Sequence, residues 1–266
     1  MIFKTKTGTQ CISREQVWSA WKHVRTGGKG MGIDQVSVDA INANPRKYLY
    51  PLWNRLSSGS YFPPAVKETA IPKGKHGKRY LGIPTICDRV AQQVIRTELE
   101  AILEPKFYPS SFGSRPNRSA HQAVAQCAAN CWERWYALSV DIKGFFDNLD
   151  HAILMKILRK YTDKSHILLY CERWLSAPIR CMDGRFRSPQ GKSTPQGGVI
   201  SPVIVRRVST KNRPRYRSRS TFWDLHLNPG FVSAMMVNVS GVSLPGSVAK
   251  VKARSMKVFV AQVYVV

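Results

Sequence analysis

Acidic residues are scarce in this chain of 266 residues, which has 16 Asp and Glu against 41 Lys and Arg. The resulting formal charge of +25 repels itself in a compact state, and a polyphosphate is its natural counterion. This imbalance favours nucleic-acid binding over the plainer alternative of a soluble basic enzyme. Hydrophobic residues make up 43% of the chain, an ordinary fraction for a globular core, which argues against wholesale disorder.

The chain also lacks a long hydrophobic run and a cysteine framework. Its apolar end, residues 258–266, is far too short to span a bilayer, and its first ten residues lack the apolar segment of a secretion signal. The six cysteines follow no framework spacing, and Cys127 with Cys131 is more typical of a helix core than of a zinc site. We therefore expect a cytoplasmic, non-secreted protein with reduced thiols and no membrane partner.

The hydrophobic pattern predicts both helices and strands, as in an α+β fold. Helices are expected over residues 13–26, 45–56, 88–104, 119–131, 152–161 and 167–175, with Ser13 and Gln16 forming a capping box and Asp88 capping the third helix. Strands are expected in a hairpin over 66–73 and 78–84, in a single strand over 136–142, and in a second hairpin over 180–186.

The ordered pattern stops near Ile204. Residues 205–266 hold eleven basic residues and a single acidic one, Asp224, and Pro214 would break a helix that continued from 201. We expect this stretch to form an irregular, poorly ordered basic tail.

The strand over 136–142 ends in a carboxylate, Asp141. A carboxylate fixed at the end of an interior strand suits a Mg²⁺ ligand, and Phe146 could lie against the sugar of a bound nucleotide. A solvated aspartate beside two core phenylalanines is the alternative, and residue types alone leave both open.

Three further segments carry groups suited to nucleic acid. Lys73 and Arg79 on the first hairpin could clamp a triphosphate, although a solvated basic hairpin is an equal alternative. Gln196 and Gly197 combine a side-chain amide with backbone that can approach a base pair closely. Arg115 and Arg118 precede a helix start, where backbone N–H groups also favour phosphates.

These segments resemble, in their order, the group II intron reverse transcriptase/maturase family. The matching strings are Ile71-Pro72-Lys73, Leu81-Gly82-Ile83-Pro84-Thr85, Arg115-Pro116-Asn117-Arg118-Ser119, the run from Asp141 to Asp147, and Pro195-Gln196-Gly197-Gly198-Val199-Ile200-Ser201-Pro202. Four ordered motifs over residues 30–204 make the resemblance specific.

The resemblance implies a right-hand polymerase fold, with fingers over residues 1–130, a partial palm over 131–204, and a non-family tail over 205–266. It makes Asp141 a catalytic ligand to two Mg²⁺ ions, assisted by the backbone carbonyl of Ile142. It also implies that the dNTP contacts Lys73, Arg79, Phe146, Gln196 and Gly197, and that the template RNA contacts Arg115 and Arg118. Intron RNA and a DNA primer are the other implied partners.

The sequence departs from the family in one respect that concerns catalysis. The palm needs a Tyr-x-Asp-Asp turn after Pro202, and no Asp-Asp pair occurs anywhere in this chain. Because two Mg²⁺ ions about 4 Å apart need several carboxylates, we expect the chain to be inactive in DNA synthesis. The loss of resemblance after Ile204 indicates a frameshift in a degraded gene. A non-enzymatic RNA-binding or splicing remnant, and a non-functional pseudogene product, are the alternatives.

Overall fold

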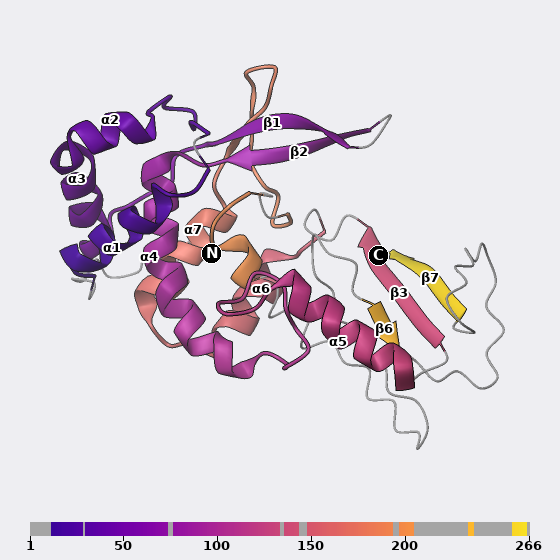
Figure 1. The fold of residues 1–266 in the computed structure, drawn as a ribbon. Helices are drawn as coiled ribbons and strands as arrows, with labels where there is room; N and C mark the ends of the chain where they lie inside the picture. The colour runs from indigo at the N-terminus through magenta and orange to yellow at the C-terminus, as the bar shows by residue number, and fades with distance from the viewer. Residues whose placement is uncertain are drawn as a thin grey trace. The chain divides into compact units, whose positions relative to one another are not determined.

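The computed structural model describes residues 12–28, 30–73, 77–133, 136–143, 148–193, 197–204, 234–236 and 257–264. Contacts divide the chain into two compact units, the first made of residues 1–103 and 149–204 and the second of residues 104–148 and 205–266 (Figure 1). The expected boundaries at residues 130 and 204 follow polymerase subdomains rather than contacts, and they stay a prediction.

The first unit is built around one central helix, α4 (Ile86–Leu103) (Figure 1). Helices α1 (Arg14–Val24), α3 (Pro45–Ser57) and α7 (Ser165–Leu175) pack against it. The short α2 (Val38–Ala43) and α6 (His151–Leu158) complete the unit by packing on α3 and α7. Apolar residues of α4 recur at helical spacing and are fully buried, as expected for a helix enclosed by neighbours: Ile86, Val90, Ile95, Leu99 and Leu103.

Local capping chemistry sets where these helices begin. The capping box at the start of α1 is confirmed, because Gln16 N–H donates to Ser13 Oγ at 3.2 Å and Ser13 N–H donates back to the Gln16 side chain at 2.7 Å. The expectation that Asp88 caps α4 is wrong. Thr85 does so, since its hydroxyl accepts from Asp88 N–H at 3.1 Å, and Asp88 lies inside the first turn. Helix α2 was missed, because six residues are too few to show a clear period.

The first unit also carries a four-stranded sheet in the order β2-β1-β4-β5. Its strands are β1 (Val66–Lys73), β2 (Gly77–Ile83), β4 (Ile179–Arg180) and β5 (Phe186–Arg187). Both expected hairpins are confirmed, and β1 joins them by a parallel pairing with β4. Val66 and Ile179, partners in that pairing, are buried and turn one face of the sheet toward the core.

The second unit contains the turn η1 (Glu104–Lys106), the helix α5 (Ala120–Glu133) and a three-stranded sheet in the order β6-β3-β7. The expected strand at 136–142 is confirmed as β3 (Tyr136–Lys143). It pairs with β6 (Ala234–Met236) and β7 (Lys257–Tyr264), so two stretches of the range expected to be irregular form strands. The rest of residues 205–266 lies outside the described residues.

No described helix is both long enough and apolar enough to cross a lipid bilayer.

Candidate functional site

Two of the motifs identified in the sequence meet at a pair of glycines. Gly197 has a φ of +117°, and a Cβ atom at this position would lie 2.6 Å from the carbonyl oxygen of Gly82 in β2. Glycine is required because the φ is one that other residues rarely adopt and because a side chain would collide with backbone. The sequence predicted an approach to a base pair here, whereas this glycine permits an approach to the protein's own hairpin.

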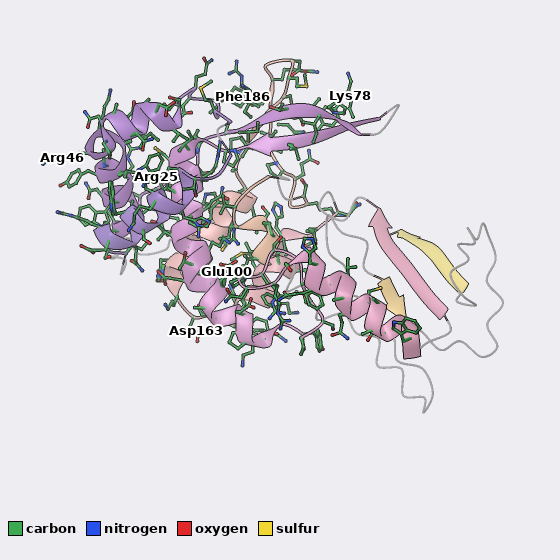
Figure 2. All side chains as sticks on the ribbon, in the orientation of Figure 1. Arg25, Arg46, Lys78, Glu100, Asp163 and Phe186 are labelled. Carbon is green, nitrogen blue, oxygen red and sulfur yellow. The ribbon has the colours of Figure 1, made fainter. Side chains whose placement is uncertain are left out.

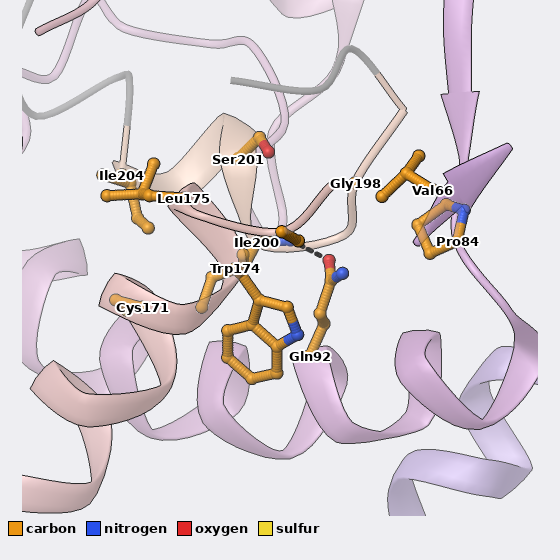
Figure 3. Close-up of a pocket in the computed structure, with 11 residues that line it drawn as sticks. Val66, Pro84, Gln92, Cys171, Trp174, Leu175, Gly198, Ile200, Ser201 and Ile204 are labelled. Carbon is orange, nitrogen blue, oxygen red and sulfur yellow. Dashed lines mark hydrogen bonds between the residues drawn. The ribbon is translucent and has the colours of Figure 1, made fainter. Parts of the chain in front are cut away.

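The turn that follows Gly197 is held by the side chain of Gln92 on α4. The backbone N–H groups of Val199 and Ile200 donate to Gln92 Oε1 at 2.7 and 3.2 Å, and the dashed line in Figure 3 marks this link. The turn is therefore fixed at both ends, by Gly82 of the hairpin at its start and by Gln92 at residues 199–200.

Gln92 is held in turn by a buried carboxylate, Asp88, one helical turn earlier. Gln92 Nε2 donates to Asp88 Oδ2 at 2.9 Å, while the Tyr61 hydroxyl and the Trp174 indole N–H donate to Asp88 Oδ1 at 2.7 and 2.8 Å. Asp88 is only 1% exposed, and burial raises the pKa of its carboxyl, with the hydrogen bonds from Trp174, Tyr61 and Gln92 acting in the opposite direction. Each carboxylate oxygen thus has a donor, which a buried acid requires.

The segment that leads into the turn is also anchored. Ser193 N–H donates to the Leu149 carbonyl at 2.9 Å, and His151 N–H donates to the Gly191 carbonyl at 2.9 Å. Ser193 has a φ of +82°, a strained conformation for a residue with a side chain, and its carbonyl is hydrogen-bonded to the His151 ring at 2.5 Å. Residues 191–193 are therefore tied to the chain that follows the Asp141 motif.

The glycine-rich loop before α2 is fixed at its described residues, although the sequence suggested a flexible loop. The Arg89 guanidinium donates to the carbonyl of Gly28 at 2.6 Å, to that of Gly30, and to that of Pro84 at 3.2 Å. Gly32 lies so close to Thr85 that a Cβ atom would come within 2.5 Å of the Thr85 Cα atom. These contacts hold the loop against the start of α4.

A small cavity lies behind the turn, among apolar side chains of β1, α7 and the segment 198–204 (Figure 3). Its volume of about 20 Å³ is enough for one water molecule and far too small for a nucleotide. The cavity therefore belongs to the core, and any nucleotide has to bind outside it.

The outward face of the sheet carries two cations and an aromatic ring in one row. Lys67, Arg180 and Phe186 stand in register on β1, β4 and β5, all three are exposed, and Phe186 is 64% exposed (Figure 2). Neighbouring strands lie about 4.8 Å apart, so the three side chains are adjacent. In the described part of the chain neither Lys67 nor Arg180 forms an ion pair.

The nearest acidic residue on these strands faces the other way. Glu68 follows Lys67 on β1 and Arg187 follows Phe186 on β5, so both lie on the opposite face, where they form an ion pair at 3.4 Å. The outward row therefore keeps its positive charge, and an exposed aromatic ring beside it suits the stacking of a base.

The two arginines expected to contact RNA differ in their surroundings. Arg115 is enclosed by its own loop, since it forms an ion pair with Glu104 at 2.7 Å and donates to the carbonyls of Tyr108 and Ser111 at 2.7 and 2.8 Å. Arg118 is exposed, with its guanidinium 5.4 Å from the centre of the Phe112 ring. A template contact by Arg115 stays a prediction that would require it to leave these partners, whereas Arg118 is accessible.

Most of the other predicted site residues are described by their backbone alone or not at all. Lys73 ends β1, Arg79 pairs with Ile71 in the hairpin, and Asp141 and Ile142 lie in β3. The side chains of Lys73, Arg79, Asp141 and Ile142, and the whole of Phe146 and Gln196, lie outside the described residues. Their roles stay predictions.

The acidic groups of this chain do not fit a site for two magnesium ions. Among the described side chains no three His, Cys, Asp or Glu residues converge as metal ligands. The sequence adds no Asp-Asp pair that could accompany Asp141. One carboxylate cannot offset the charge of two divalent cations.

Sequence reasoning missed Asp88 and Gln92 as residues that support the turn. A signal was present, because two polar residues spaced four apart lie on a helix whose buried positions are mostly apolar, and buried polar groups need partners. The partners themselves, Tyr61, Trp174 and the turn at 199–200, lie far away in the sequence and could not be identified from spacing.

Comparison with known proteins agrees with this arrangement of motifs. The family described as reverse transcriptase (RNA-dependent DNA polymerase) matches residues 71–224, which is more than half of the chain. The matched range begins in β1, includes both Gly82 and Gly197, and extends past Ile204.

Curated relatives are similar over about two thirds of the chain. Protein YkfC of Escherichia coli (strain K12) is 32% identical over 185 residues, which cover 67% of this chain and 48% of the relative. Group II intron-encoded protein LtrA of Lactococcus lactis subsp. cremoris is 33% identical over 181 residues, 66% of this chain and 29% of the relative. Nuclear intron maturase 4, mitochondrial, of Arabidopsis thaliana is 24% identical over 151 residues, 56% and 18% of the two chains. The matched part of the chain thus spans less than half the length of each of these relatives.

Proposed function

This chain belongs to the reverse transcriptase (RNA-dependent DNA polymerase) family, in its group II intron-encoded branch, and on that premise we propose that it binds RNA and a dNTP but does not synthesise DNA by itself. The observation that carries the proposal is the outward row of Lys67, Arg180 and Phe186, which offers positive charge outside any described ion pair beside an exposed ring. The net charge of +25 acts in the same direction over the whole chain.

The nucleotide roles follow the family motifs, residue by residue. Lys73 and Arg79 bind the triphosphate, Gln196 and Gly197 border the incoming nucleotide, and Phe146 lies beside its sugar. The contact between Gly197 and Gly82 supports this proposal, since it keeps the hairpin that carries the cations beside the turn that carries the amide. Arg118 contacts the template RNA, and Arg115 orders the loop before it.

The family generally uses Mg²⁺, and Asp141 with the Ile142 carbonyl is the part of that site which the sequence retains. Because the donor set does not fit two ions, no catalytic step is assigned to this chain. The RNA strand is held instead by charge and stacking: Lys67 and Arg180 pair with phosphates, and Phe186 stacks on a base.

RNA binding is tested by measuring the fluorescence anisotropy of a labelled single-stranded RNA over a series of salt concentrations. Replacing both Lys67 and Arg180 by Ala should weaken binding and reduce the slope of log K against log salt by about 2, one for each lost phosphate contact. Phe186→Ala should leave that slope unchanged and cost about 1–3 kcal/mol of stacking.

Two variants serve as matched controls for this experiment. Arg187→Ala removes the same charge from the opposite face of β5, and Met182→Ala removes an exposed apolar side chain from the neighbouring hairpin turn. Both should bind RNA as the wild type does. If the row variants bind RNA with the wild-type affinity and slope, the surface is wrongly assigned.

A non-enzymatic splicing remnant is the second candidate, and the single carboxylate at the metal position favours it. The same anisotropy assay separates it from non-specific attraction, when an intron RNA and an unrelated RNA of equal length are compared at one salt concentration. Preference for the intron RNA supports a remnant that retains recognition. Equal binding of the two RNAs leaves only the general attraction between a basic surface and phosphates.

A further inference from the structure

The buried polar groups between α4 and the turn form a chain of hydrogen bonds with only one possible direction. At one end the Trp174 indole N–H can only donate, and at the other end the backbone N–H groups of Val199 and Ile200 can only donate. The two residues between these ends must therefore accept at both outer positions. Asp88 accepts at both of its oxygens, and Gln92 accepts from the turn through Oε1 while it donates to Asp88 through Nε2.

This direction explains why the pair is a carboxylate followed by an amide. An amide at position 88 would present an NH₂ group either to Gln92 Nε2 or to Trp174, both of which are donors. A carboxylate at position 92 would face the Asp88 carboxylate across 2.9 Å. Each change on its own leaves a buried group facing one of its own kind, which is unfavourable in a site that excludes water.

We propose that Asp88 and Gln92 are positioning residues, which set the conformation of the turn at residues 197–201 in which it borders a bound nucleotide. The assignment of a nucleotide to this turn rests on the function proposed above, whereas the positioning itself rests on the hydrogen bonds. Neither residue touches the ligand, and both act through the backbone of Val199 and Ile200.

Positioning differs from simple stabilisation of the fold in what a substitution changes. Apolar residues of similar shape often stabilise a core as well as a buried polar group does, whereas a polar chain selects one arrangement among several compact ones. Loss of the chain therefore frees the backbone at 199–200 to turn away, and binding at the turn falls further than stability does.

An exchange of the two functional groups tests the proposal. Asp88→Asn places a donor against a donor, and Gln92→Glu places a carboxylate against a carboxylate. In the double variant, D88N/Q92E, the amide at position 88 accepts from Tyr61 and Trp174 through its oxygen. Its NH₂ group donates to the carboxylate at position 92, which accepts from Val199 and Ile200. Every hydrogen bond is then restored, with the charge moved from the first position of the pair to the second.

The first measurement is hydrogen exchange at the Val199 and Ile200 amides of the full chain, at a temperature where circular dichroism shows each variant folded. Each single variant should lose protection about tenfold or more, as expected for a broken buried hydrogen bond, and the double variant should return to within about threefold of the wild type. The second measurement is photo-crosslinking of a radiolabelled dNTP, which should fall and recover in parallel. Gln93→Glu is the matched control, since it adds the same charge one residue further along α4 without touching the chain of bonds.

The outcomes separate this inference from the proposed function. If the single variants keep the two amides protected, or if the double variant stays as unprotected as the single ones, the positioning role is overturned. If a single variant does not fold, folding and protection of the double variant decide in the same way. If the wild type does not crosslink to a dNTP at all, the proposed nucleotide binding is wrong, while amide protection still decides whether Asp88 and Gln92 position the turn.

Discussion

Gly197 shows how one residue can serve the fold at a position that the motif assigns to the ligand. Its positive φ and its approach to the Gly82 carbonyl are two separate reasons for glycine. Gly184, at the tip of the second hairpin, has only the first reason, because its φ is +84° and no described atom lies within 4 Å of the position of an added Cβ atom. The pair therefore distinguishes backbone strain from a steric collision.

Gly197→Ala should destabilise the chain considerably more than Gly184→Ala. The cost of the control is backbone strain alone, on the order of 1–2 kcal/mol, whereas at position 197 a collision with backbone is added to it. The free energy of unfolding, measured with urea for both variants, checks this expectation. Equal costs would show that the contact with Gly82 does not constrain residue 197.

Helix α4 is the element on which the first unit depends. Its start is capped by Thr85, its first two turns support the segment 197–201 through Asp88 and Gln92, and its later turns bind two other helices through Glu98. Glu98 accepts from Lys164 and His166 on the α7 side, both at 3.0 Å, and from Gln16 of α1 at 3.3 Å. One carboxylate thus joins three helices.

The pH dependence of stability should report this carboxylate. Burial acts to raise the pKa of Glu98, but the hydrogen bonds and charges of Lys164 and His166 together outweigh burial and lower it. Because the pKa of Glu98 is lower in the folded state, its contribution is present above the ordinary glutamate pKa of 4.5 and is lost as the pH falls through the folded value.

Glu98→Gln should therefore be less stable than the wild type by about 1–2 kcal/mol at neutral pH, and the difference should shrink as the solution is acidified. Urea denaturation at a series of pH values measures it. Glu100→Gln is the control, since Glu100 lies on the same helix and its ion pair is with Arg96, four residues earlier. A difference between wild type and Glu98→Gln that does not change with pH would contradict the role of the ionised carboxylate.

At the scale of the whole molecule, charge sets both what the chain binds and what it does not catalyse. A net charge of +25 attracts nucleic acid over its surface, yet the same shortage of acidic groups leaves Asp141 without the companions that two metal ions need. Binding and catalysis thus make opposite demands on charge, and this composition meets only the first.

Primer extension on an RNA template with Mg²⁺ and dNTPs should consequently give no product beyond that of a heat-killed sample. A commercial reverse transcriptase in the same mixture is the positive control for template and primer. Extension by the wild-type chain that is lost in Asp141→Asn would show that the remaining acidic groups suffice for catalysis, and would overturn the proposed inactivity.

Local elements and family membership could be predicted without coordinates. The capping box at Ser13, the two hairpins and the strand that holds Asp141 follow from side-chain periodicity and turn residues, which act over a few positions. The shortage of Asp and Glu, and the missing Asp-Asp pair, are likewise properties of the sequence alone.

What holds the turn at residues 197–201 became visible only in the folded chain. The N–H groups of Val199 and Ile200 bond to Gln92, more than a hundred positions earlier, and Gly197 contacts a strand of the hairpin. Spacing along the chain could not reveal these pairs, because a buried polar group takes whichever partner the packing of distant elements brings within about 3 Å. Packing likewise encloses Arg115, and strand pairing leaves the outward row on β1, β4 and β5 open to solvent.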